Sequence, residues 1–402
     1  MTILITDHGA VGDGRSVCTK AIQRAIDLCP KGGEVLIPEG KFLSGALFLK
    51  SDMTLRLAKG AYLLASRDTR DFPLMTYRFE GCEHLCYASL INTSGAPSKN
   101  ISIVGEGTIH GGGMPLYEAE RTENAGKRGR AVCIRNTDGV IIRGVTVRQS
   151  PAWCLHLIYC TNILIENAKI FTKYTEDGTP CDMFNGDGID LDSCQSVTVR
   201  DCLIGSEDDC IAIKSGRDTE GRRVGIPSRD ILVENCEFVS GFGVAIGSEM
   251  SGGVENVTVR NCSFRDTFSV VSIKPIRPRG GYVRNITYEN CTHENTSTEH
   301  GDCLWFKAAI YIDGFYACEE GKYDPDLAAE KSEGTPILEN VTLKNVTSRT
   351  VAGRGVYICG LPESPIQGLR LIHVRSEGTK PPFVHNAPDA QLTDTDFKVT
   401  GE

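Results

Sequence analysis

Short stretches of alternating apolar and polar residues recur along most of the chain. Each stretch begins with a polar residue or a glycine and continues through the alternating run, and most copies reach an Asn or Asp near the end. The copies read NISIVG from Asn100, GVIIRGVTV from Gly139, NILIENAKI from Asn162, SVTVRDCLI from Ser196, DILVENCEF from Asp230, NVTVRNCSF from Asn256, NITYENCTH from Asn285, NVTLKNVTS from Asn340 and GLRLIHVRS from Gly368. Because side chains along a strand point to opposite faces in turn, this period of two predicts strands with one buried face.

The spacing of these stretches indicates a solenoid. Between Gly139 and Asn285, successive copies start 23, 34, 34, 26 and 29 residues apart. Periods of this length, with short strands and no helical pattern, are typical of stacked coils. A coil can bury its apolar face only against its neighbours, so equivalent strands should run parallel, roughly 4.8 Å apart. We therefore predict an all-β parallel β-helix, with residues 1–402 in a single domain.

Two segments depart from the repeat. Between Cys18 and Cys29 the apolar residues follow helical spacing, which predicts an amphipathic helix that caps the open end of the solenoid. We place this cap and the first coils in about residues 1–60. The repeat is also interrupted over residues 295–338, where we expect an insertion that forms a loop beside the groove.

Seventeen cysteines raise the question of disulfides or a metal site. Cys202, Cys236, Cys262 and Cys291 occupy the same place in four successive repeats, each after an Asp or Asn. Such columns indicate thiols that pack as small apolar groups beside a ladder of Asn and Asp side chains. The count is odd and no CxxC pair has zinc spacing, so we expect reduced thiols and predict no metal and no cofactor.

Location and partners are less well defined. The first residues carry neither a positive segment nor a long apolar run, so no secretory signal is recognised. We therefore expect a cytoplasmic protein, whereas a chain trimmed of its signal peptide would be extracellular and look the same. No window holds the roughly 18 apolar residues of a membrane span. The net charge of −9 gives no basic surface for nucleic acid. The sequence does not decide between a monomer and a homo-oligomer.

Two acidic segments precede neighbouring strands. They are NGDGIDLD from Asn185 and EDDCIAIK from Glu207. In the second segment the isoleucines must face the core, so Asp208 and Asp209 are expected in the turn before the strand. The same phase places Asp187 just before the preceding strand. Asp187 and Asp209 are 22 residues apart, about one coil, so the three carboxylates should be stacked neighbours.

Three carboxylates this close suggest acid–base chemistry. Like charges cannot all form easily at one spot, so one pKa should rise. A protonated carboxyl beside ionised ones suits glycoside hydrolysis, because one group protonates the leaving oxygen and another activates water. Two other interpretations remain open. The acidic turns could only keep the solenoid soluble, or they could bind calcium, which carboxylates suit.

Further motifs accompany these aspartates in a specific order. They are DHGAVGDG from Asp7, SPAWCLH from Ser150, Asn185 with Asp187, Asp208 with Asp209, IGSEMSGG from Ile246 and GLPE from Gly360. Over nearly its whole length the chain resembles glycoside hydrolase family 28, the polygalacturonases, and particularly the bacterial exo-acting branch. The resemblance implies a single-stranded right-handed parallel β-helix of the pectin-lyase-like type, an oligosaccharide or glycoside substrate and hydrolysis with inversion. It also implies Asp208 as the acid, Asp187 and Asp209 as the pair that holds and activates water, and no metal.

Two positions depart from the family pattern. Phe242 replaces the histidine of a glycine-histidine-glycine motif, and Ser272 replaces the arginine of an arginine-isoleucine-lysine motif that ends here in Lys274. Loss of the arginine removes a bidentate grip on a galacturonate carboxylate. Arg277 and Arg279 are the candidates to compensate for it. Phe242 offers an apolar platform for a sugar. We therefore expect action on rhamnogalacturonan fragments or other decorated glycosides, with a polygalacturonase proper as the alternative.

Three more residues are candidates for substrate binding. Asn185 belongs to the Asn-x-Asp motif that contains Asp187. His156 should point outward beside the strand's buried leucines, where sugar binding and a structural role are equally open. Tyr311 lies in the insertion and could edge the groove.

Two functions of other classes remain as alternatives. A polysaccharide lyase on the same fold would need a basic residue to abstract a proton, and usually calcium on the carboxylates. A non-catalytic carbohydrate-binding β-helix would bind sugars without turnover. Intact aspartates favour the hydrolase over both.

Overall fold

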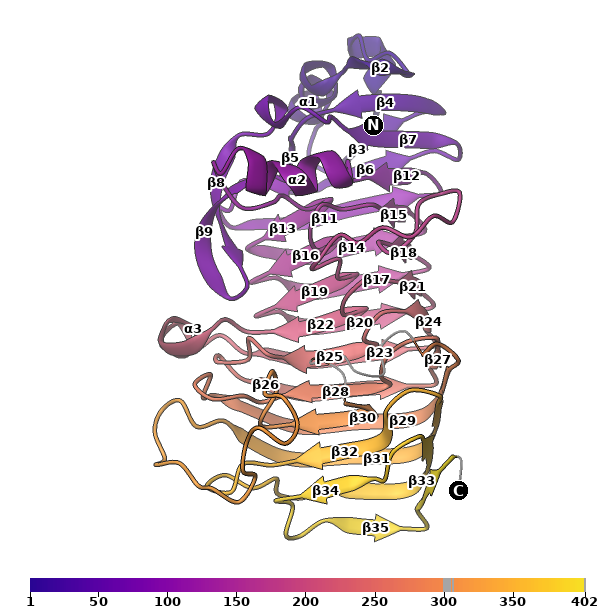
Figure 1. Cartoon of the computed structure of the whole chain (residues 1–402). Helices are drawn as coiled ribbons and strands as arrows, with labels where there is room; N and C mark the ends of the chain where they lie inside the picture. The colour runs from indigo at the N-terminus through magenta and orange to yellow at the C-terminus, as the bar shows by residue number, and fades with distance from the viewer. Residues whose placement is uncertain (299–304, 306, 401–402) are drawn as a thin grey trace. The chain divides into compact units, whose positions relative to one another are not determined.

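The computed structural model of the protein describes residues 1–298, 305 and 307–400. Contacts within the chain divide it into two compact units. The first unit comprises Met1–Phe79, Glu83–Asp190 and Cys194–Asp208. The second comprises Glu80–Cys82, Leu191–Ser193 and Asp209–Glu402. Each unit consists mainly of short strands (Figure 1). The single domain that the sequence predicts stays a prediction.

The first unit contains three runs of parallel strands, in which each strand pairs with its counterpart in the next coil. One run is β1 (Thr2–Leu4), β3 (Gly33–Ile37), β6 (Met53–Leu57), β11 (Ser98–Gly105), β14 (Thr137–Arg143), β17 (Thr161–Glu166) and β20 (Gln195–Arg200). Another is β2 (Asp13–Val17), β4 (Gly40–Ser44), β7 (Ala61–Ala65), β12 (Thr108–His110), β15 (Thr146–Arg148), β18 (Lys169–Phe171) and β21 (Leu203–Gly205). The third is β5 (Leu47–Leu49), β10 (Ile91–Thr93), β13 (Val132–Arg135) and β16 (Leu155–Ile158). Strand β19 (Ile189–Asp192) follows β18 in the chain.

The second unit repeats this arrangement. One run is β23 (Ser228–Glu234), β26 (Val254–Arg260), β29 (Tyr282–Asn295), β31 (Ile337–Thr350) and β33 (Arg370–Gly378), which pairs with β35 (Gln391–Thr393) and β36 (Asp396–Val399). Another is β24 (Glu237–Ser240) and β27 (Ser263–Arg265), with β27 pairing onto β29. The third is β22 (Ile211–Lys214), β25 (Val244–Gly247), β28 (Val271–Lys274), β30 (Ala308–Asp313), β32 (Arg354–Cys359) and β34 (Phe383–His385).

The period of two in the sequence explains the core. In β26, Val257 and Val259 are fully buried, and they pair in register with Ile286 and Tyr288 of β29, which are also fully buried. The intervening Thr258 points away from the core and is half-buried. Burial of these columns supplies the main driving force for stacking. The prediction of an all-β parallel β-helix is confirmed.

A ladder of asparagines lies at the turns, as the columns of Asn and Asp predict. In the second unit, Asn285 donates to the side-chain oxygen of Asn256 at 3.1 Å, and Asn340 donates to that of Asn285 at 3.2 Å. These three residues have φ angles of 55° to 57°. Asn tolerates this left-handed backbone better than most residues, because its short amide can bond locally. Asn290 and Asn261 form a rung of a parallel ladder at 3.1 Å.

The thiols pack as the sequence predicts. Cys202 in the first unit and Cys236, Cys262 and Cys291 in the second are all at most 3% exposed. Every cysteine in the described part of the chain is a free thiol. They therefore behave as small buried apolar groups in the coils.

The predicted helix at the start of the chain is confirmed. Helix α1 (Thr19–Leu28) buries Ile22, Ala25 and Ile26 completely and packs near β5 in the first unit. Leu28, which the helical spacing places on the apolar face, is instead 55% exposed, because the helix ends at this residue.

Four further elements lie outside the coils. They are the two-stranded hairpin β8 (Leu74–Phe79) and β9 (Cys82–Tyr87), helix α2 (Met114–Thr122) and helix α3 (Asp218–Val224). Tyr77, Phe79 and Cys86 of the hairpin pack against Cys133 and Ala152 of the first unit. Among the helices of the described residues, none combines the length and apolar character that crossing a membrane requires.

The predicted insertion at residues 295–338 contains regular structure. Strand β30 lies inside it and pairs with β28 and β32. Residues 314–336 then form turns and loops before β31 begins. Residues 299–304 and 306, which also belong to the predicted insertion, lie outside the described residues.

Candidate active site

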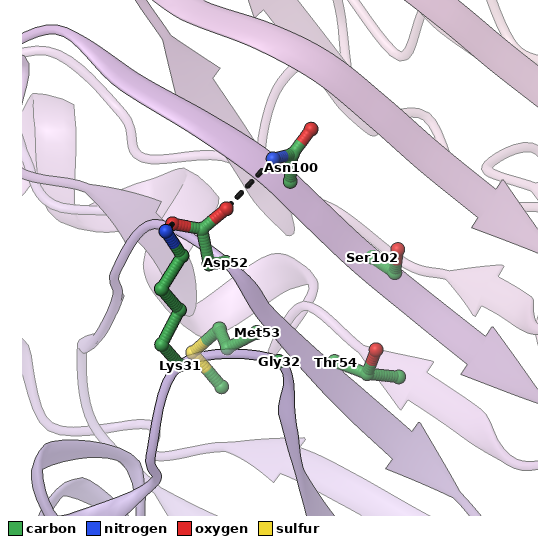
Figure 2. Close-up of a pocket in the computed structure, with 7 residues that line it drawn as sticks. All are labelled: Lys31, Gly32, Asp52, Met53, Thr54, Asn100 and Ser102. Atoms are coloured by element: carbon green, nitrogen blue, oxygen red, sulfur yellow. Dashed lines mark hydrogen bonds and ion pairs between the residues drawn. The ribbon is translucent and has the colours of Figure 1, made fainter.

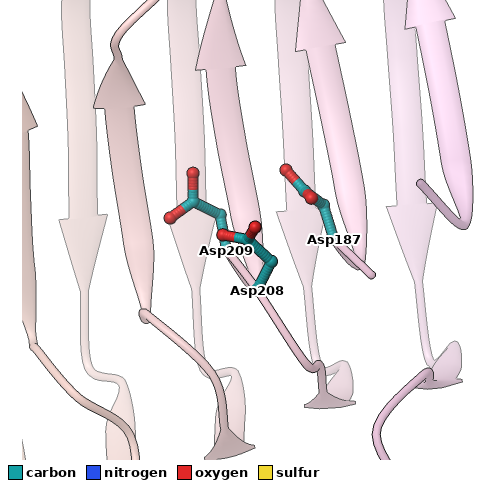
Figure 3. Close-up of side chains that lie close together, drawn as sticks. All are labelled: Asp187, Asp208 and Asp209. Carbon is teal, nitrogen blue, oxygen red and sulfur yellow. The ribbon is translucent and has the colours of Figure 1, made fainter. Parts of the chain in front are cut away.

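Three aspartates gather at the entry to two strands. Asp187 lies in the loop that enters β19, and Asp208 and Asp209 lie in the turn that enters β22. Their carboxylate oxygens lie within 4.8 Å of one another, and Figure 3 shows the three side chains side by side. The spacing of about one coil and the phase of the buried isoleucines predict this cluster. The catalytic roles of the three residues stay a prediction.

The three carboxylates differ in burial. Asp187 and Asp209 are each 2% exposed, whereas Asp208 is half-buried. Backbone hydrogen bonds position the segments that carry them. The Cys154 amide donates to the Asp187 carbonyl at 2.8 Å, and the Asp208 amide donates to the Gly186 carbonyl at 3.3 Å. Asp208 is therefore the member of the cluster best placed to meet an approaching molecule.

A buried lysine lies beside this cluster. Lys274 Nζ is 2.9 Å from Asp209 Oδ2 and 3.2 Å from Oδ1, and the lysine is 6% exposed. Lys274 thus points towards the aspartates and not into the apolar core. The pair gives the site a fixed positive charge at one carboxylate. A divalent cation bound to the same carboxylate would be repelled by this ammonium group.

More cations surround Lys274 in the second unit. Lys214 Nζ is 3.7 Å from Glu249 Oε2. Burial alone would raise the pKa of Glu249, but Lys214, Arg279 and Lys274 together hold it below its usual value. The positive charges around Glu249 thus outweigh its burial.

Both arginines that are candidates to replace the missing carboxylate grip at Ser272 already have partners within the protein. Arg277 makes two hydrogen bonds to Glu363, at 2.5 and 2.7 Å. Arg279 donates to Asp218 Oδ1 at 2.8 Å and to the Ser248 carbonyl at 3.1 Å. A substrate carboxylate would have to compete with these partners.

The two departures from the family pattern have different surroundings. Phe242 is half-buried, and its ring stacks on that of Phe268 with the centroids 4.1 Å apart. Ser272 is 2% exposed and pairs with Ala245 of β25 and Tyr311 of β30. A partly exposed apolar ring and a small, buried residue thus stand at the two positions.

Two more predicted substrate-binding residues, His156 and Tyr311, are buried, as Ser272 and Lys274 are. His156 is fully buried, lies edge-on to Trp153 and contacts the Cys133 thiol, so packed side chains cover it. Tyr311 is 1% exposed and donates to Asp313 Oδ2 at 2.8 Å. Burial raises the pKa of Tyr311 well above its usual value. These positions argue against the predicted sugar contacts, because other side chains already fill the space above both residues.

Asn185 is held by an arginine that the sequence analysis missed. Arg128 Nη2 donates to Asn185 Oδ1 at 2.8 Å, and its Nε donates to Glu120 Oε2 at 2.8 Å. Arg128 also donates to the carbonyls of Phe184 and Pro151. Arg128 thus fixes the loop that leads to Asp187. No sequence pattern links it to that loop, which lies more than fifty residues away.

A second missed residue is Glu207, which directly precedes the aspartate pair. Burial, together with the charge of Asp208, raises the pKa of Glu207 to about 7. Its amide donates to Thr172 Oγ1 at 2.9 Å and to the Gly186 carbonyl at 3.1 Å, which fixes it against the loop before β19. The sequence predicts a raised pKa among the three aspartates and not at Glu207. The sequence signal that could have identified Glu207 is its position directly before Asp208.

Replacing Glu207 by Gln should stabilise the protein at pH 8 by on the order of 2 kcal/mol and leave it unchanged at pH 4. The folded pKa of about 7 lies above the ordinary 4.5. With Glu207 protonated, below pH 4.5, the folded state has its full stability. As the pH rises through 7, ionising the buried carboxyl costs free energy and lowers the stability of the folded state. Gln keeps the shape but cannot ionise. Urea unfolding at both pH values measures the difference. The exposed Glu118→Gln is the matched control, and a Glu207→Gln protein less stable than wild type at pH 8 contradicts the prediction.

A large hollow lies elsewhere in the first unit. It has a volume of 540 Å³ and is lined by residues of β6, β11 and the preceding loops (Figure 2). Asp52 there accepts a hydrogen bond from Asn100 at 2.7 Å and lies 3.7 Å from Lys31. Its only carboxylate is thus engaged with neighbours, and no second acid lines the hollow. The aspartate cluster is the better candidate for acid–base chemistry.

Known proteins resemble the chain over nearly its full length. The model of glycosyl hydrolases family 28 matches residues 34–391. A probable polygalacturonase of Vitis vinifera is 30% identical over 398 residues, covering 94% of this chain and 76% of its own. An exo-poly-alpha-D-galacturonosidase of Dickeya chrysanthemi is 26% identical over 98% of this chain and 70% of its own. The crystal structure of a hyperthermoactive exopolygalacturonase from Thermotoga maritima covers 98% of this chain and 92% of its own, at 27% identity and a TM-score of 0.78.

These matches agree with the coiled fold described above, and they include the segments that carry the aspartate cluster. The shared fold is a right-handed parallel β-helix, as predicted. The family match includes the segments that carry Asp187, Asp208 and Asp209. The chain is a glycoside hydrolase and belongs to glycosyl hydrolases family 28.

Proposed function

We propose that the protein is an exo-acting hydrolase of pectic oligosaccharides that inverts the configuration of the sugar it releases. The observation that carries this proposal is the half-buried Asp208, whose carboxylate lies within 4.8 Å of the buried Asp187 and Asp209. A solvent-facing acid beside two enclosed carboxylates matches the two tasks of glycoside hydrolysis.

The proposed reaction uses each carboxylate once. Asp208 gives its proton to the glycosidic oxygen as the bond to the anomeric carbon breaks. Asp187 and Asp209 hold a water molecule, which attacks that carbon and passes a proton to one of them. Lys274 keeps the charge of Asp209 in place at 2.9 Å. Exchange with solvent then returns a proton to Asp208 and removes the proton that Asp187 or Asp209 received.

Inversion is the outcome that the family resemblance implies. In enzymes with two catalytic carboxyl groups, separations of about 6.5–9.5 Å accompany inversion and about 5–5.5 Å retention. Here one oxygen of each of the three carboxylates lies within 4.8 Å of the others. With three carboxylates, however, the water can lie between two of them, so the spacing rule for pairs does not transfer directly. The stereochemistry therefore needs its own measurement.

Exo action is supported by the tip of the hairpin. In the second unit the Gly81 carbonyl accepts a hydrogen bond from the Arg217 amide at 3.2 Å. A Cβ at Gly81 would lie 2.8 Å from Glu249 Cγ, so the tip touches the residue around which Lys214, Arg279 and Lys274 gather. If the hairpin tip closes one end of the substrate-binding site, a sugar chain cannot extend past it, and only the end of a chain can bind there. The names of the relatives in Dickeya and Thermotoga also specify exo action.

The substrate is proposed from the charges near Asp209. Lys274 and the cations around Glu249 favour an acidic sugar such as galacturonate at one position. The partly exposed Phe242 favours a less charged or more apolar sugar, such as rhamnose, at another. Rhamnogalacturonan oligosaccharides combine both. Polygalacturonate itself is the second candidate, favoured by the names of the relatives and by the retained Lys274.

Product analysis on a substrate panel tests this proposal. The panel contains polygalacturonate, rhamnogalacturonan oligosaccharides and neutral galactosides and rhamnosides, each with and without chelator. We expect single sugars from chain ends, fastest from rhamnogalacturonan oligosaccharides and unaffected by chelator. Faster release from polygalacturonate would select the second candidate. An unsaturated, ultraviolet-absorbing product lost in chelator would instead establish a lyase, and binding without any product a non-catalytic protein.

A further inference from the structure

The two tryptophans of the chain have opposite environments. Trp153 is fully buried and stacks on Phe79 with the ring centroids 5.2 Å apart. Trp305 is 38% exposed. A single exposed apolar side chain needs no special explanation. Trp305, however, is part of a group, because its ring centroid lies 5.3 Å from that of Tyr316, with the rings tilted by 45°.

Tyr316 connects Trp305 with the carboxylates. Lys274 Nζ lies 5.2 Å from the centroid of the Tyr316 ring and 2.9 Å from Asp209 Oδ2. Tyr316 is itself partly buried and packs against the cluster that contains Tyr311 and Phe315. Trp305, Tyr316, Lys274 and Asp209 therefore form a continuous row of contacts within the second unit. The row starts at a carboxylate of the site and ends at an exposed indole ring.

We propose that Trp305, supported by Tyr316, is a sugar-binding platform for a unit of the substrate that lies beyond the cleaved bond. This inference rests on the proposed function, since it needs an oligosaccharide at Asp209. Its ligand is a galacto-configured pyranose, whose C–H groups at C3, C4 and C5 form an apolar patch on one face. Those C–H groups carry partial positive charge and meet the negative face of an aromatic ring favourably.

The surroundings favour this ligand over other occupants. One side of the Trp305 ring packs against protein and the other is exposed to solvent. Such a ring suits a ligand that has one apolar face and hydrogen-bonds to water with its other groups. Lys274 supplies a positive charge along the same row, which suits an acidic sugar such as galacturonate. A pectic oligosaccharide meets both conditions.

Fluorescence tests the platform without relying on turnover. Trp153 is fully buried, so a change of emission on ligand binding should come from Trp305. In an Asp208→Asn protein, which binds without cleaving, trigalacturonate and a rhamnogalacturonan oligosaccharide are titrated. We expect a shift of the emission to shorter wavelength and weaker quenching by acrylamide. The same titration of Asp208→Asn with Trp305→Phe should show neither change. An undiminished change in that double variant, or binding by calorimetry without any change in the single variant, would overturn the inference.

Kinetics in the active enzyme provide the second test. Trp305→Ala should raise KM for oligosaccharides about tenfold and leave kcat unchanged, as expected for lost uniform binding. Trp305→Phe should retain most of the affinity, because it keeps an aromatic face. Unchanged KM in Trp305→Ala would overturn the platform while leaving the proposed function intact. A wild-type enzyme that cleaves no pectic substrate would instead remove the proposed function itself.

Discussion

Replacing Asp208 by Asn should lower kcat by about 10²–10⁴-fold, because a general acid typically contributes that much to the rate. Asn has the same shape but carries no proton that it can give to the leaving oxygen. Asp208 is half-buried and its backbone is fixed by Gly186, so the fold should be kept. Steady-state rates on the best substrate of the panel, together with unfolding curves, measure both effects.

The matched control for this substitution is Asp182→Asn. Asp182 is exposed and lies in the loop that leads to Asp187. Its replacement makes the same change of side chain away from the cluster and should leave kcat nearly unchanged. Asp187→Asn and Asp209→Asn should each resemble Asp208→Asn, because the attacking water needs both carboxylates. Wild-type rates in all three would remove the catalytic assignment.

Replacing Lys274 by Met should lower the free energy of unfolding by about 3–5 kcal/mol and also abolish most activity. Lys274 and Asp209 are 6% and 2% exposed, and their charged atoms are 2.9 Å apart. Removing the lysine leaves a buried carboxylate without this partner. It also removes the charge that fixes one of the two water-holding groups. Urea unfolding at pH 7 and steady-state kinetics test these two consequences.

The chain offers a control pair at its surface. Lys344 Nζ lies 2.6 Å from Glu289 Oε1, but the lysine side chain is 46% exposed. Lys344→Met should therefore cost no more than about 1 kcal/mol. Combining Lys274→Met with Asp209→Asn should recover part of the lost stability, since no unpaired charge remains, yet the enzyme should stay inactive. A single Lys274→Met variant as stable as Lys344→Met would contradict the assigned role of the buried pair.

The coils could be predicted because each one repeats the same physical constraints. The alternating run around Val257 must bury every second side chain, and Asn256 must adopt the left-handed backbone at the turn, with φ of 55°. The same phase argument places Asp208 and Asp209 before their strand. These features depend on local sequence and on neighbouring coils only.

The covering loops could not be predicted in this way. Strand phase indicates that His156 points away from the core, and the insertion is expected to place Tyr311 at the groove. Neither argument shows that other side chains lie over these two residues. Trp153 and Cys133 cover His156, and the segment that contains Asp313 and Phe315 covers Tyr311. A period of two carries no information about irregular segments.

The elevated pKa in the cluster shows the same limit. Repulsion among the three aspartates predicts a raised pKa at one of them, which stays a prediction, whereas the structure has a raised pKa at the neighbouring Glu207. Its cause is first of all burial, and the loop that carries Thr172 and Gly186 packs against this residue. The spacing of acidic residues alone does not reveal that packing.

The most direct test of the central claim is the configuration of the sugar at the moment of its release. Proton NMR of the anomeric signal, recorded within the first minutes of hydrolysis by the wild-type enzyme, distinguishes the two outcomes before mutarotation mixes them. Attack by a water held between Asp187 and Asp209, with Asp208 as the acid, predicts a first product with the anomeric configuration opposite to that of the cleaved bond. A first product with the same configuration would mean that one aspartate attacks the sugar directly, and would contradict this account.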